Sequence, residues 1–168
     1  MMLRPCDDDL LAELVRANQD VETAFTVCAH TTRNEHLGAM LLERALLCGR
    51  AARELVAVRA ANDRRICADT VSSAPGAPDW MALQAALAAR DDASVRDECV
   101  RTEEETLMRF RDTFEHDLPA HIRRIVQRYF AALLHCHGGL RHLDLPAPDD
   151  SPSGRSLRGK RARIAPRV

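Results

Sequence analysis

Residues 119–143 read PAHIRRIVQRYFAALLHCHGGLRHL, with apolar side chains separated alternately by four and three positions. This heptad spacing puts the apolar side chains on one narrow stripe of an α-helix. A helix of this length is only marginally stable by itself in water, so the stripe must pack against other helices. The residues of the stripe are Ile122, Val126, Tyr129, Leu133, Cys136, Leu140 and Leu143.

Two further helices are predicted at the start of the chain. Residues 7–9 are aspartates, and carboxylates suit the first turn of a helix, where N–H groups are unpaired and the helix dipole is positive. The apolar spacing then continues to about Thr31. Asn34 is expected to cap a second helix that continues through Val58. Because the connection is so short, the two helices should form an antiparallel hairpin.

A second hairpin is predicted after a longer connection. Residues 69–79 are rich in helix-breaking residues and indicate a loop, which a short alanine-rich helix over residues 80–89 follows. Asp91 or Asp92 then caps a third long helix that ends near His116, and the heptad stretch forms the fourth. No segment has the alternating pattern of a strand. The prediction is therefore an all-α four-helix bundle of two antiparallel hairpins, joined by a longer connection that contains a short helix.

Charge divides the chain into a bundle and a tail. The 24 basic and 25 acidic side chains nearly balance, but residues 151–168 hold six bases and no acid. Several prolines precede this segment, so we expect residues 1–145 to form the bundle and residues 146–168 a disordered basic tail. Contact with nucleic acid is expected only through that tail, if at all. Lys160 is the only lysine, a bias typical of a GC-rich bacterial genome.

No apolar run approaches the roughly 18 residues that a membrane span needs, and the chain turns acidic at once where a secretion signal would be basic and then apolar. We therefore expect a cytoplasmic protein with no membrane partner. Six cysteines occur without a CxxC motif, and four of them fall on apolar stripes, where a free cysteine packs as a small hydrophobe. Counted from a turn near Leu118, Cys99 and Cys136 should lie at the same level of the bundle.

The second helix is apolar on more than one side. Leu42, Leu46 and Leu47 lie off its heptad stripe and still need cover. Two covers remain open at this point: the short helix over residues 80–89, or contact with a second copy of the chain.

Three charged residues, Glu22, Arg44 and Glu103, lie on or beside the inward stripes. One interpretation is a buried ion pair that neutralises Arg44 and fixes how the helices align. Glu22 is the better partner, because it lies 11 residues before a turn near Arg33 and Arg44 lies 11 after it. Glu103 joins this pair if the third long helix comes alongside.

The other interpretation is an iron or manganese site with Glu22 and Glu103 as ligands, since hard cations accept oxygen ligands alone. Arg44 would offset the negative charge that attracts such a cation. In addition, no Glu is followed three positions later by His, although that motif supplies ligands in di-iron bundles. The ion pair is therefore the preferred interpretation.

A set of short motifs is spread over the four long predicted helices. Its members are Asp20, Glu22, Phe25 and Ala29, then Arg44 with Glu54 and Leu55, then Glu98, Cys99, Arg101 and Glu103, and finally Gln127 with His135. On these motifs the chain resembles, from about Leu10 to Leu143, a family of bacterial four-helix proteins of unassigned function that is grouped with the ferritin-like fold. The resemblance implies a ferritin-like connection between the hairpins, and it implies no reaction.

No Gly-rich phosphate loop, HExxH sequence or ordered Ser/His/Asp set occurs in the chain. We therefore expect a protein that is not an enzyme and holds no cofactor, with a structural, stress-linked or protein-interaction role. Its expected partner is a second copy of itself or another protein. The alternative is an iron- or manganese-binding or redox protein with a non-standard set of carboxylate ligands.

Overall fold

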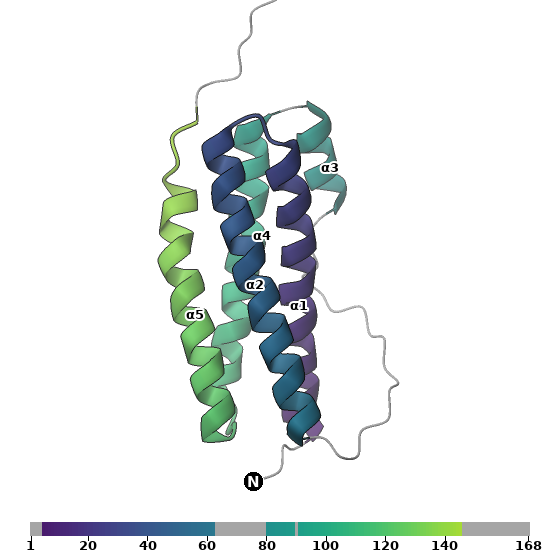
Figure 1. Ribbon diagram of the computed structural model, residues 1–168, viewed down its shortest axis with the longest axis vertical. Helices are drawn as coiled ribbons and strands as arrows, with labels where there is room; N and C mark the ends of the chain where they lie inside the picture. The colour runs from purple at the N-terminus through teal and green to yellow at the C-terminus, as the bar shows by residue number, and fades with distance from the viewer. Residues whose placement is uncertain (1–4, 63–79, 90, 146–168) are drawn as a thin grey trace, which may run out of the picture.

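The computed structural model describes residues 5–62, 80–89 and 91–145. Four long helices lie side by side, and a shorter one lies next to them (Figure 1). The all-helical fold predicted from the sequence is confirmed, and no strand occurs within the described ranges. The helices are α1 (Pro5–Thr31), α2 (Glu35–Asn62), α3 (Trp80–Ala89), α4 (Asp92–Asp112) and α5 (Ala120–Arg141), with a 3₁₀ turn at Thr113–Glu115.

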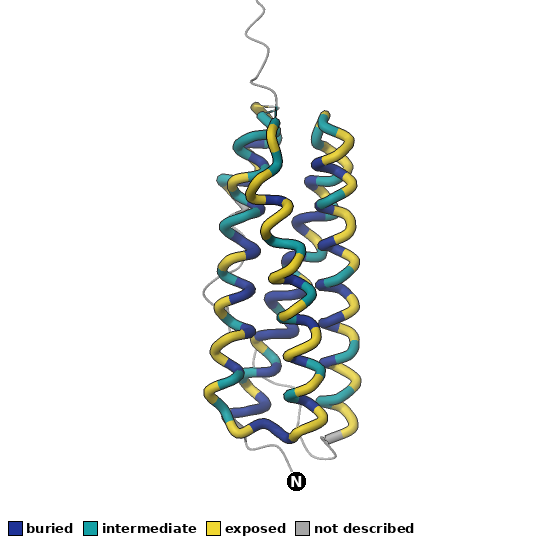
Figure 2. The backbone as a smooth tube through the Cα atoms, turned by 90° about the vertical axis from the view of Figure 1, so that its left-hand side faces the viewer, coloured by how far each residue is buried: buried dark blue, intermediate teal, exposed yellow. Residues whose placement is uncertain are grey.

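Each long helix packs against two others. Both α1 and α5 contact α2 and α4, so the four helices form a ring around a shared interior. Buried positions recur along each helix at helical spacing, with exposed positions between them (Figure 2). The heptad stripe of α5 supplies five of these buried side chains, which are Ile122, Val126, Tyr129, Leu133 and Leu140.

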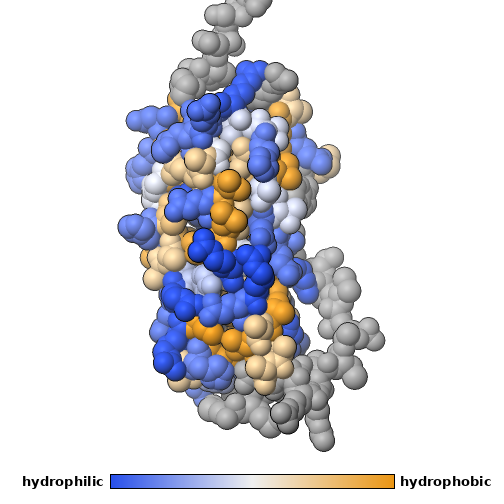
Figure 3. Space-filling view, viewed as in Figure 1, coloured by the Kyte–Doolittle hydropathy of each residue, from blue (hydrophilic) through white to orange (hydrophobic). Residues whose placement is uncertain are grey.

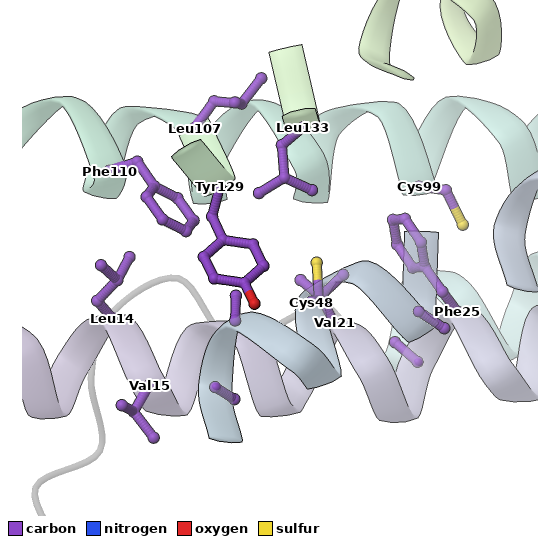
Figure 4. Packing of buried hydrophobic residues seen from close by; sticks show 14 of the residues in the cluster. Leu14, Val15, Val21, Phe25, Cys48, Cys99, Leu107, Phe110, Tyr129 and Leu133 are labelled. Atoms are coloured by element: carbon purple, nitrogen blue, oxygen red, sulfur yellow. The ribbon is translucent and has the colours of Figure 1, made fainter. Parts of the chain in front are cut away.

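Large apolar side chains fill the interior of the bundle. Leu14 of α1 points toward Phe110 of α4, and Phe25 of α1 points toward Cys99 of α4 (Figure 4). Both phenylalanines are almost inaccessible, at 1% and 0% exposure. Full burial of a side chain of this size stabilises a fold by roughly 1.5–3 kcal/mol. The amphipathic pattern of the sequence is therefore the main source of the stability of the fold.

Two polar residues fix the turn between α1 and α2. Asn34 caps α2 as predicted, because its side-chain oxygen accepts a hydrogen bond from Leu37 N at 2.9 Å. The carboxylate of Asp92, at the start of α4, accepts from Thr32 Oγ1 at 2.6 Å, from Arg33 N at 3.2 Å and from Asn34 N at 2.8 Å. The start of α4 is thereby attached to the turn of the first hairpin.

The neighbouring Asp91 has a different task. Its backbone is extended, with φ −101° and ψ 96°, and its side chain accepts from Ala93 N at 3.1 Å. Asp91 is therefore the N-cap of α4, which settles the choice between the two aspartates. The short helix expected over residues 80–89 is α3, with the same bounds.

The short helix α3 packs against α4 and, less extensively, against α1. Of the two covers that the sequence leaves open for the second apolar face of α2, the structure excludes the short helix, because Leu42 and Leu46 remain 38% and 49% exposed. Only Leu47 is partly buried against the core. An apolar stripe on a short helix does not specify which long helix it meets. Viewed with α2 toward the reader, apolar side chains gather on this face between hydrophilic ones (Figure 3).

None of the described helices is both long enough and apolar enough to cross a membrane. The basic tail predicted for residues 146–168 lies outside the described residues.

Candidate functional site

A buried ion pair joins α2 to α4. Arg44 Nε lies 3.1 Å from Glu103 Oε1, and each side chain is only 2% exposed. Both residues occupy inward positions of their helices, and Arg44 is among the largest fully buried side chains of the described chain. Water therefore cannot solvate either charge, and the pair must be stabilised by its protein neighbours.

The Arg44 guanidinium also donates to two backbone carbonyl groups. Nη1 donates to Met40 O, one turn earlier in α2, at 3.0 Å, and Nη2 donates to Cys136 O in α5. Gly139, one turn further along α5, lies beside this arm: a Cβ added there would be 3.8 Å from Arg44 Nη2, an ordinary van der Waals contact, and 3.2 Å from Met40 Cε. Arg44 thus connects three helices, and each of its three guanidinium nitrogens has a protein acceptor.

His137 of α5 forms a polar cluster together with Arg44 and Glu103. Its Nδ1 lies 2.9 Å from Glu103 Oε2, and its Nε2 lies 3.5 Å from Glu104 Oε1. Its side chain is only 12% exposed. Glu103 therefore has one oxygen on Arg44 and the other on His137. Nothing in the sequence identifies His137 as a site residue. Its position two residues after His135 indicates only that the two side chains point to different sides of the helix.

Burial dominates the electrostatics of the cluster. Desolvation raises the pKa of Glu103 above its ordinary value, against the opposing effects of the Arg44 charge and the His137 hydrogen bond. Burial also raises the pKa of the nearby Cys48 thiol, and the negative charge of Glu103 acts in the same direction. The ion pair therefore forms in spite of a desolvation penalty that its partners only partly offset.

Glu22 does not face Arg44. Its Oε1 lies 3.1 Å from Arg53 Nη1, and the two side chains are 33% and 64% exposed. Its carboxylate lies directly against α2, where a Cβ added at Gly49 would be 2.0 Å from Oε1. Counting residues from the turn predicts how far along the hairpin Glu22 lies. It does not predict the direction in which the Glu22 side chain points around the helix axis. Glu22 therefore belongs to a surface pair, and Glu103 is the carboxylate that meets Arg44.

The two carboxylates named as metal-ligand candidates are thus separated. Glu22 lies beside Arg53, and Glu103 lies between Arg44 and His137. Within the described parts of the chain, no three or more His, Cys, Asp or Glu side chains are grouped so that they could hold a metal ion. The residues present do not fit a di-iron centre, because a fixed guanidinium occupies one oxygen of the inward carboxylate.

The contacts between α4 and α5 also define their alignment. Arg96 Nη1 donates to Leu143 O at 3.0 Å, which sets Cys99, three residues further along α4, level with Leu140. Cys136 is four residues away from that level, or about one helical turn. The prediction that Cys99 and Cys136 share a level is therefore off by about a turn, because the two helices are joined by an extended segment and not by a symmetric turn at Leu118.

A surface groove of about 630 Å³ lies between α1 and α4, and none of the ion-pair residues lines it. Its rim carries both signs of charge, with Glu13 and Glu105 as well as Arg109 and Arg111, and its wall includes Met108, which is 55% exposed. Asp112 adds a third carboxylate, and none of the described residues that line the groove is a His, Cys, Ser or Thr. The groove therefore offers no arrangement of acid, base and nucleophile for catalysis.

Comparison with known proteins gives one match. A family model described as a domain of unknown function, DUF2383, matches residues 9–116, which is more than half of the chain. The match includes Arg44 and Glu103 and stops before α5 with His137. No curated protein matches the chain.

Proposed function

The chain belongs to the DUF2383 family of unknown function, and we propose that this protein is a ferritin-like four-helix bundle that acts through protein interaction and not through a metal centre. The observation that carries the proposal is the buried pair of Arg44 and Glu103. A guanidinium at this position neutralises the inward carboxylate that a cation would need as a ligand.

In this proposal the cluster has a structural role. Arg44 bonds to Glu103 on α4 and to the carbonyl of Cys136 on α5, so one side chain of α2 fixes the alignment of three helices. A buried polar contact of this kind favours one arrangement over similar ones, because any slip would leave a charge unpaired. The rigid bundle would then present its outer faces to a partner, in a structural or stress-linked role.

A carboxylate-based iron or manganese site is the alternative, and one observation favours it. His137 of α5 lies near two carboxylates of α4, with its Nδ1 2.9 Å from Glu103 Oε2 and its Nε2 3.5 Å from Glu104 Oε1. Both donor types bind iron and manganese. Binding would require Glu103 to release Arg44, which would leave a buried guanidinium next to the cation. That repulsion makes the interaction role the better supported proposal.

Metal analysis separates the two functions. The full chain is expressed with excess iron and manganese and purified without chelator, together with Glu103→Ala and a matched control, Glu105→Ala, whose carboxylate pairs with Arg101 on the surface of α4. We expect all three proteins to hold far less than one equivalent of metal. Stoichiometric metal that is lost in Glu103→Ala and kept in Glu105→Ala would overturn the proposal and establish the metal site.

A further inference from the structure

A second stripe of residues follows the outer face of α2. Its members are three or four positions apart, so they lie on one side of the helix, and all of them are exposed. The stripe includes the two leucines that α3 does not cover. Its members are Glu35, Ala39, Leu42, Leu46, Arg50, Arg53 and Ala57.

Charge is distributed unevenly along this stripe. Glu35 lies at its start, Arg50 and Arg53 lie toward its end, and the two leucines lie between them. When such a stripe is turned end over end, its acidic end meets its basic end and its leucines meet leucines. This stripe of seven residues is therefore complementary to itself in an antiparallel arrangement, and the exposed Glu43 lies beside it.

We propose that a second copy of this chain packs on the outer face of α2, with the two α2 helices antiparallel across a two-fold axis. The axis passes near the level of Arg44, so that Leu42 lies opposite Leu46 of the second copy. The same alignment places Glu35 opposite Arg53 of the second copy, and symmetry repeats each contact. This inference rests on the proposed interaction role and names the partner.

Within the described residues, the charged ends of the stripe are exposed and can make these contacts. Arg53 is 64% exposed and gives only its Nη1 to Glu22, so its remaining guanidinium donors can reach a second carboxylate. Glu35 is exposed in the first turn of α2. The leucines would lose their contact with water on pairing, which is the main favourable contribution to association.

The expected interface is small. From Glu35 to Arg53 the stripe extends about 27 Å along the helix axis, and one helix from each copy supplies most of the contact. Interfaces of this size belong to the weak, reversible class, with dissociation constants of about micromolar or higher. The dimer should therefore form at high protein concentration and dissociate on dilution.

The first test is sedimentation velocity of the full chain across protein concentrations from about 1 μM to several hundred μM. Wild type should shift from monomer to dimer, whereas Leu46→Glu should stay monomeric throughout. Leu134→Glu is the matched control, because Leu134 is 52% exposed on α5 and lies outside the stripe. It should dimerise like wild type. A monomeric wild type, or a dimer that Leu46→Glu leaves intact, would overturn the pairing.

The second test reverses the charges. Glu35→Arg and Arg53→Glu should each weaken association at least tenfold, because each creates two like-charge contacts across the axis. An equimolar mixture of the two variants should associate again, since every Arg then faces a Glu. Failure of the mixture to associate would overturn the antiparallel alignment. Circular dichroism of each variant checks folding. Metal content is measured on the same samples: a metal-free protein that stays monomeric contradicts the pairing alone, whereas stoichiometric metal contradicts the proposed interaction role.

Discussion

Arg44 and Glu103 hold opposite charges where water cannot reach them. Moving two ions out of water costs several kcal/mol each, and the attraction between them recovers this only when all remaining donors and acceptors are satisfied. Here two backbone carbonyl groups accept from Arg44 Nη1 and Nη2, and His137 lies at hydrogen-bond distance from the second oxygen of Glu103. The pair is therefore more important for which structure forms than for how stable that structure is.

Removing one member of the pair should be costly. Arg44→Ala should lower the free energy of unfolding by roughly 3–5 kcal/mol, because Glu103 is left buried without its counter-charge. The double variant Arg44→Met with Glu103→Leu should recover most of that loss. Arg53→Ala, which breaks a surface pair, should cost under about 1 kcal/mol. Urea unfolding measures all three, and an Arg44→Ala loss no larger than that of Arg53→Ala would contradict the burial argument.

The pH dependence follows from the same burial. Because desolvation raises the pKa of Glu103 above 4.5, the folded protein holds this proton more tightly than the unfolded chain does. The stability that this group contributes is therefore complete below about pH 4.5 and is lost as the pH rises through the raised pKa. The difference between the free energy of unfolding of wild type and that of Glu103→Gln should fall as the pH rises above about 4.5. Urea titrations that show this difference rising with pH would contradict the assignment.

At the scale of residues, the sequence predicts which charges are inward better than it predicts which charges meet. Arg44 and Glu103 interrupt apolar stripes, which is visible in the spacing of the chain. Glu22 lies beside a stripe, and a shift of one position turns a side chain by about 100° around the helix. That turn sends its carboxylate to Gly49 and Arg53. Contacts across helices depend on this direction, which no count of residues along a hairpin supplies.

At the scale of elements, the start of α4 performs two tasks with adjacent residues. Asp91 caps its own helix, and Asp92 accepts three hydrogen bonds from the α1–α2 turn. Helix bounds could be predicted well because caps are local signals. The attachment of α4 to that turn could not, because nothing in the sequence near Asp92 indicates a partner about 60 positions earlier.

Asp92→Ala should lower the free energy of unfolding by about 1–3 kcal/mol, since it leaves two partly buried donors of the turn, Thr32 Oγ1 and Asn34 N, without their acceptor. Thr32→Val removes one of those donors and should cost less. In the Asp92→Ala background, Thr32→Val should cost almost nothing, because its acceptor is already gone. The same loss for Thr32→Val in both backgrounds would show that the two side chains are not coupled. Thermal or urea unfolding of the four proteins completes the cycle.

At the scale of the whole molecule, thiol reactivity should follow opening of the bundle. Cys28, Cys48 and Cys99 are at most 1% exposed. The hydrogen bond to Cys99 lowers the pKa of the Cys28 thiol, and the same bond, together with burial, raises the pKa of the Cys99 thiol. Despite the lowered pKa, Cys28 should not react in the folded protein, because a thiol reagent must reach the sulfur.

Mass-spectrometric mapping of alkylated peptides checks this prediction. In native buffer, the half-buried Cys136 should be labelled well before Cys28, Cys48 and Cys99, which should be labelled together and at a rate that rises with urea. Rapid labelling of Cys99 in native buffer would show that α1 and α4 separate locally. Equal rates for all four cysteines would contradict the packing described for α5.

The two aspartates at the start of α4 have a consequence for how the chain can change in evolution. Asp92 attaches the start of α4 to the α1–α2 turn by direct hydrogen bonds, while Asp91 caps α4 itself, so the fit of the two hairpins does not depend on the length of the link that precedes α3. Insertions and deletions in that link should therefore be tolerated among relatives. Asp91 and Asp92, in contrast, should stay next to each other in the sequence. For the same reason, two separately synthesised halves, divided within the link, carry the contacts needed to reassemble by fragment complementation.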